Sequence, residues 1–70
     1  MTAHNVHVTF DHEKNEWKVA SENAERADSY HTTLQEATKR GEEIAKNRGA
    51  DLIKHNKENG QIESRESFSK

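Results

Sequence analysis

Residues 33–49 read TLQEATKRGEEIAKNRG and carry helix signals at both ends. Thr33, followed three residues later by Glu36, forms a capping box, in which two orphan amide donors of the first turn are satisfied. Arg48 occupies the last turn, and Gly49 follows where many helices end in a left-handed residue. We therefore predict a helix over residues 33–48.

One stripe of this predicted helix is apolar. Its members recur at the spacing of an amphipathic helix, and they are Leu34, Ala37, Gly41, Ile44 and Ala45. The stripe is thin, which predicts that the helix packs on something flat.

Two segments before the helix alternate apolar and polar residues, the period of a half-buried strand. Residues 5–10 place Val6, Val8 and Phe10 on one face, and residues 16–20 place Trp17 and Val19 on one face. The polar stretch between them, residues 11–15, suits a hairpin loop. The next segment, residues 21–32, is the least readable, and a short strand over 26–30 anchored by Tyr30 stays open.

A second hairpin follows the helix. Residues 51–55 form its first strand, and residues 61–65 form the second with Ile62 inward, extended through Ser67 and Phe68 as an open alternative. Asn59-Gly60 supplies the turn, because this pair tolerates positive φ. Leu52 and Ile53 are adjacent, so one of them leaves the core face.

The order β-β-α-β-β predicts an α+β fold, a small two-layer sandwich in which one helix packs on one face of an antiparallel sheet. We expect a single domain over residues 1–70 with an ordered core of about 4–68. The predicted core consists of Val6, Val8, Phe10, Trp17, Val19, Leu34, Ala37, Ile44, Ala45, Leu52 and Ile62.

Composition limits the functional classes. Hydrophobic residues make up 29% of the chain, the net charge is −2 and there is no cysteine, so disulfides and thiolate zinc sites are excluded. No apolar run is long enough to span a membrane and no signal peptide follows the first residue, so we expect a cytoplasmic protein without a membrane partner. A small scaffold without staples gains stability by self-association. A monomer and a homodimer both fit the sequence at this point.

Charge is unevenly distributed along the chain, with −4 over residues 1–37 and +3 over residues 38–57. The candidate nucleic-acid contacts in the basic part are Lys39, Arg40, Lys46, Arg48, Lys54 and Lys57. Glu42 and Glu43 interrupt them, and few aromatic residues are present to stack on bases. Weak nucleic-acid binding is therefore the alternative function rather than the first.

Histidines and carboxylates raise two further possibilities, a metal site and catalysis. Of the five histidines, His7 and His55 share the outer face of the sheet if their strands are neighbours, but exposed imidazoles explain them more simply. We expect no metal and no cofactor. The groups Asp11/His12/Glu13 and Glu42/Glu43 lack a cleft that would tune them for acid–base work, so we expect no enzyme.

The order of these motifs resembles a small bacterial domain, the domain of unknown function 2188 family. The residues that carry the resemblance are Val6, Val8, Trp17, Val19, Thr33, Ala37, Ala45, Gly49, Asn59, Gly60, Ile62, Ser67 and Phe68. The resemblance covers about residues 5–68 and departs mildly at Asn23-Ala24, where such domains often carry Gly-Ala. It implies the fold and transfers no functional residue, since the family has no established activity.

The sequence thus predicts a non-enzymatic interaction module, with protein–protein contact including self-association as its main function. Two features favour this class: the residue of the Leu52/Ile53 pair that faces outward, and an edge strand over residues 62–65 that can pair with another chain.

Replacing Trp17 with alanine tests the predicted core. Removing a core tryptophan costs about 3–5 kcal/mol, which is comparable to the whole stability of so small a domain. We expect Trp17→Ala to be largely unfolded in a thermal melt followed by circular dichroism. A variant that melts like the wild type would contradict the assignment of Trp17 to the core.

Overall fold

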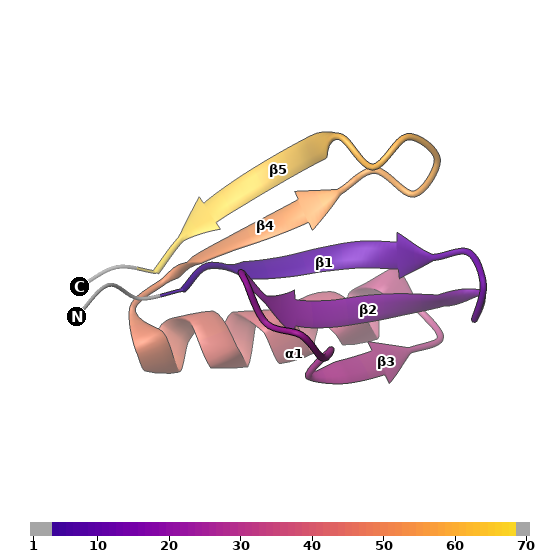
Figure 1. The fold of residues 1–70 in the computed structure, drawn as a ribbon. Helices are drawn as coiled ribbons and strands as arrows, with labels where there is room; N and C mark the ends of the chain where they lie inside the picture. Colours follow the sequence, from indigo (N-terminus) through magenta and orange to yellow (C-terminus); the bar gives the residue numbers. More distant parts are fainter. Residues whose placement is uncertain (1–3, 69–70) are drawn as a thin grey trace.

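The structure is a computed structural model that describes residues 4–68. In chain order its elements are β1 (Val6–Asp11), β2 (Glu16–Ser21), β3 (Ser29–His31), α1 (Leu34–Arg48), β4 (Asp51–His55) and β5 (Ile62–Ser67). Figure 1 shows the helix along one face of the sheet. The remaining residues of the predicted domain, 1–3 and 69–70, lie outside the described part of the chain. No helix in residues 4–68 is long and apolar enough to cross a membrane.

The five strands form one sheet in the order β3-β2-β1-β4-β5. The predicted α+β class, with one helix on one face, is confirmed. The two central strands, β1 and β4, are parallel, whereas we expected antiparallel pairing throughout. The reason is the connection: α1 crosses the sheet between β3 and β4, and a crossover returns the chain in its original direction. The other three contacts are antiparallel.

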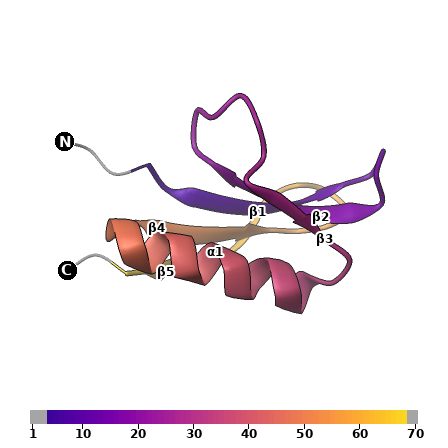
Figure 2. The same ribbon diagram turned by 90° about the horizontal axis from the view of Figure 1, so that it is seen from below.

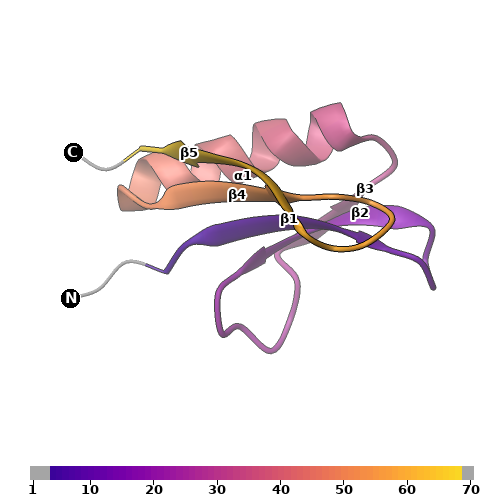
Figure 3. The ribbon, with the colours of Figure 1, turned by 90° about the horizontal axis from the view of Figure 1, so that it is seen from above.

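Views along the sheet show two layers. Figure 2 and Figure 3 place α1 on one side of the strands and the loop between β2 and β3 on the other. The third strand, β3, covers Ser29–His31 and so begins later than the segment 26–30 that we left open. It pairs with β2, with Tyr30 opposite Lys18.

Both predicted helix ends are confirmed. The Thr33 hydroxyl oxygen accepts a hydrogen bond from the Glu36 amide at 3.2 Å, as predicted. The Glu36 carboxylate accepts from the Thr33 hydroxyl rather than from the Thr33 amide, so one of the two amide bonds of the predicted capping box forms. At the other end Gly49 adopts φ 69° and its amide donates to Ala45 O. Local sequence therefore fixes where α1 begins and ends.

The core lies between α1 and the middle of the sheet. Its buried members are Val6, Val8, Val19, Ala37, Ile44, Ala45 and Leu52, with Trp17 and Phe68 partly buried against them. Two predicted core residues are wrong: Leu34 is 38% exposed and Ile62 is 61% exposed. Phe10 is only partly buried and lies edge-on to the Trp17 ring, with centroids 5.1 Å apart.

The position of the helix explains these exceptions. α1 contacts β1, β2, β3 and β4 but not β5, so the sheet extends beyond the layer that covers it. Ile62 lies on β5 opposite His55 and therefore has no helix above it. Ile53 is the residue that leaves the core face, since its neighbour Leu52 is buried under the helix, yet Ile53 is only 4% exposed.

Gly41 lies where the helix packs tightly on the sheet. A Cβ atom there would lie 2.7 Å from Leu52 Cδ1 and 3.3 Å from Val8 Cγ2. Leu52 is completely buried, so its side chain has no open space into which to move. The absence of a side chain at Gly41 allows α1 to lie directly on β1 and β4.

We expect Gly41→Ala to destabilise the fold. Overpacking costs about 1–3 kcal/mol, and the better helix propensity of alanine returns about 0.5–1 kcal/mol, so the net loss is at most about 2.5 kcal/mol. Urea denaturation followed by circular dichroism measures it. Lys39→Ala, at an exposed position of the same helix, is the control and changes stability by less than about 0.5 kcal/mol. An alanine variant at Gly41 more stable than the wild type would contradict the packing argument.

Candidate functional site

The basic residues predicted as nucleic-acid contacts do not form one surface. Lys39 and Lys46 are seven residues apart on α1 and share its outward side, with Glu42 and Glu43 between them. Arg40 is turned toward the segment before β3, where its Nε lies 3.0 Å from Asp28 Oδ2, and its Nη1 lies 3.7 Å from Glu43. Carboxylates therefore interrupt the positive charge on the helix.

The other predicted contacts point to separate places. Arg48 donates a hydrogen bond to the Ser21 hydroxyl at the end of β2. The Lys46 ammonium lies 5.6 Å from the centre of the Phe68 ring, and the Lys57 ammonium lies 4.5 Å from that of Phe10. These cation–π contacts hold the lysines against the protein surface.

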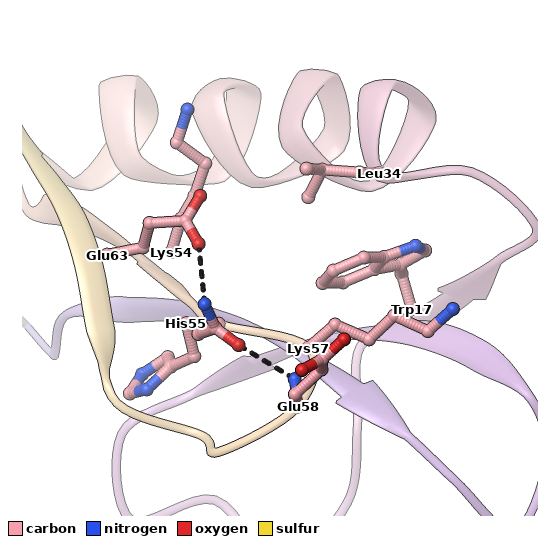
Figure 4. Close-up of a pocket in the computed structure, with 8 residues that line it drawn as sticks. Trp17, Leu34, Lys54, His55, Lys57, Glu58 and Glu63 are labelled. Carbon is pink, nitrogen blue, oxygen red and sulfur yellow. Dashed lines mark hydrogen bonds between the residues drawn. The ribbon is translucent and has the colours of Figure 1, made fainter.

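Lys54 and Lys57 line a hollow of about 420 Å³ beside the start of α1. Figure 4 shows Trp17 and Leu34 on one side of it and the β4–β5 hairpin on the other. Its lining residues are Trp17, Leu34, Lys54, His55, Asn56, Lys57, Glu58 and Glu63. Two lysines are matched by two glutamates, so the hollow has no net charge that would select a polyanion.

β5 is the longer of the two edge strands, and all six of its residues are exposed. The Phe68 amide donates to Ala50 O at 3.2 Å. Together with the register, this bond shows which β5 residues direct their backbone groups toward β4. In such a ladder, alternate residues direct their backbone groups toward the neighbouring strand and away from it. Ser64 and Glu66 therefore face β4, whereas the Arg65 amide points outward. No strand in residues 4–68 pairs with this outer edge.

An ion pair ties β5 to β4 near this edge. Arg65 Nε lies 2.7 Å from Asp51 Oδ2, and Arg65 Nη2 lies 2.5 Å from the same oxygen. The hydrogen bond from Arg65 lowers the pKa of the Asp51 carboxyl below its ordinary value of 3.8. Partial burial raises this pKa, and a hydrogen bond from Ser67 lowers it further. The guanidinium is thus placed by its pairing with Asp51, and it also covers the outer face of β4.

The histidines are placed in part as the sequence predicted. β1 and β4 are neighbours, so His7 and His55 do share the outer face, with His7 Nδ1 2.8 Å from His55 Nε2. His12 bonds to Lys57 O, and His31 bonds to the Ser29 hydroxyl, each away from that pair. No group of three or more His, Cys, Asp or Glu side chains within residues 4–68 is arranged to hold a metal ion.

The groups weighed for catalysis serve as loop and surface residues. The Asp11 carboxylate accepts hydrogen bonds from the Glu13 and Lys14 amides, which shapes the β1–β2 loop. The β4–β5 loop is held similarly by Asn56, whose side chain accepts from the Glu58 and Asn59 amides. Sequence reasoning missed Asn56, although an Asn two residues before a polar turn is a recognised Asx-turn signal.

The Asp51–Arg65 pair makes a pH-dependent prediction. Because the pKa of Asp51 is lowered in the folded protein, its stabilising effect is present above the ordinary carboxyl pKa and is lost as pH falls through the lowered value. We expect Arg65→Ala to raise the Asp51 pKa toward its ordinary value, as measured by carboxyl-detected NMR titration. Identical titration curves in wild type and variant would contradict this ion pair.

Comparison with known proteins gives one match. The family model described as "Uncharacterized protein conserved in bacteria (DUF2188)" matches residues 6–68, from the first residue of β1 to Phe68. No curated protein and no solved structure matches the chain. The resemblance inferred from the Val, Trp and Gly motifs is confirmed, and the chain belongs to the DUF2188 family of uncharacterized bacterial proteins.

Proposed function

We propose that this protein is a non-enzymatic interaction module that associates through the outer edge of β5, and that its partner is a second copy of the chain. The observation that carries the proposal is the exposure of β5 along its whole length, with no contact to α1. An uncovered edge strand presents backbone donors and acceptors that readily pair with another strand.

Symmetry favours a second copy paired edge to edge. Two β5 strands related by a twofold axis pair antiparallel and form a closed dimer. Pairing β5 with the opposite edge of the next molecule would produce an open chain of molecules, and that edge, β3, has only three residues. The small core described above also gains stability from a contact that buries more surface.

Like charges restrict the register of this dimer. An axis at Arg65 would oppose two arginines, and an axis at Glu66 would oppose two glutamates. Like charges directly opposite each other are unfavourable. A twofold axis at Ser64 avoids both pairs, so the Ser64-centred register is the one we propose.

Nucleic-acid binding is the alternative function. It depends on the basic residues of α1 and the β4–β5 hairpin. In the described part of the chain, these residues lie beside carboxylates and aromatic rings. Salt-dependent retention on a polyanion column would favour this alternative, because phosphate contacts release counterions.

Two substitutions at Arg65 test the proposed dimer. Arg65→Pro removes the outward amide, and proline is tolerated where a strand amide faces away from the sheet. Arg65→Ala retains the amide and loses the same ion pair with Asp51, so it is the matched control. Analytical ultracentrifugation over a range of concentrations measures the mass.

We expect concentration-dependent dimers for the wild type, dimers that persist for Arg65→Ala with altered affinity, and a monomer for Arg65→Pro. Circular dichroism establishes that both variants remain folded. A wild-type protein that stays monomeric at millimolar concentration would refute the self-association, and equal dimerisation of both variants would refute the edge contact.

A further inference from the structure

The loop between β4 and β5 contains an asparagine whose side chain can react with its own backbone. Asn59 is followed directly by Gly60, and the 70-residue sequence holds no other Asn-Gly pair. Both residues are exposed in the turn at the tip of the β4–β5 hairpin (Figure 1). Water and hydroxide therefore reach this pair from solution. The pair lies outside β5, and the proposed dimer does not use it.

Gly60 presents an unhindered backbone nitrogen to the side chain before it. Its backbone has φ 72°, in the left-handed region that glycine adopts without strain. A Cβ atom at Gly60 would meet nothing within 4 Å, so no neighbouring group shields the turn. Each other asparagine of residues 4–68 precedes a residue with a Cβ atom, which hinders attack by that residue's nitrogen.

The loop also holds the Asn59 side chain close to this nitrogen. Asn59 Oδ1 accepts a hydrogen bond from the Gln61 amide at 3.0 Å, which makes an Asx turn. The ring of atoms that this bond closes includes the Gly60 nitrogen, so the Asn59 carboxamide is folded back over it. The same bond polarises the carboxamide carbonyl. It also stabilises the negative charge that develops on Oδ1 when a nucleophile attacks, as backbone amides do in oxyanion holes.

We propose that Asn59 of the folded protein is a site of spontaneous deamidation. Hydroxide removes the proton of the Gly60 amide, and the Gly60 nitrogen forms a bond to Asn59 Cγ. The bond from Cγ to Nδ2 breaks, and ammonia leaves. Water then opens the resulting succinimide ring at either carbonyl, which gives aspartate or isoaspartate. Water thus replaces ammonia, and nothing is oxidised or reduced.

A hydrogen bond of the loop opposes the first step. The Gly60 amide donates to Asn56 O at 3.0 Å, so this bond opens before hydroxide removes the proton. Exposed loops open at little cost in free energy, and they do so many times during a slow chemical reaction. The bond to Asn56 therefore slows the reaction without preventing it.

Deamidation changes the loop from which β5 begins. Isoaspartate lengthens the backbone between residues 59 and 60 by a methylene group, and both products place a negative charge next to Glu58. The longer backbone alters the spacing on which two contacts of Gly60 depend, its amide bond to Asn56 O and the bond from its carbonyl to His55 Nδ1. We therefore expect isoaspartate to loosen the tip of the hairpin.

The test is incubation of the whole folded protein at mildly alkaline pH, followed by peptide mapping with mass spectrometry. Asn56 is the internal control. Its Oδ1 also accepts a backbone amide, from Glu58 at 2.8 Å, but Lys57 follows it and its Nδ2 donates to Glu63. We expect conversion at Asn59 to be at least about tenfold faster than at Asn56, a difference of about 1.4 kcal/mol in barrier height.

Two variants and one further condition complete the design. Asn59→Gln is expected to lose the reaction, because its longer side chain closes a larger ring more slowly. Asn59→Asp carries the added charge without the longer backbone, so shifts in the loop amides of deamidated protein that Asn59→Asp lacks report isoaspartate. In urea the chain keeps its Asn-Gly pair and loses the bond from the Gln61 amide. We expect the folded protein to react at least as fast as the unfolded one.

Either of two results would overturn the proposal. Equal conversion at Asn59 and Asn56 would show that Gly60 gives no advantage. Slower conversion in the folded protein than in urea would show that the loop protects Asn59, and that the bond from the Gln61 amide does not promote the attack.

Discussion

The contact between Gly41 and the side chains of Leu52 and Val8 sets the distance between the helix and the sheet. A Cβ atom would not fit at Gly41 without moving buried groups, so the backbone of α1 lies directly on the two central strands. Small residues on the same stripe, Ala37 and Ala45, are fully buried beside it. A helix held so close covers the middle of the sheet well, and its limited width leaves β5 outside the covered area.

Local signals were sufficient to predict most of the secondary structure. The capping box at Thr33 and the glycine at Gly49 define a helix by contacts within a few residues, so they are readable from the sequence alone. Alternation in β1 and β2 is equally local, and it correctly buried Val6, Val8 and Val19. These predictions succeeded because each depends on neighbours in the chain.

The errors arose where a residue's surroundings come from distant parts of the chain. Ile62 and Leu34 have the same apolar character as the buried residues, but the helix does not cover the first and begins at the second. The parallel β1–β4 pairing depends on where the crossover places β4, which no short stretch encodes. Ile53 shows the opposite error, because an outward direction in a sheet does not guarantee exposure when neighbouring strands carry large side chains.

The candidate site was predictable only in its ingredients. An edge strand around residues 62–65 and a shared face for His7 and His55 both followed from the sequence, whereas the contacts of His55 with His7 and with Gly60 O depend on the fold. His55 and Gly60 also hold the loop from which β5 departs. Through these contacts of His55, the outer face of the sheet restrains the hairpin that carries β5, the strand whose edge the helix leaves uncovered.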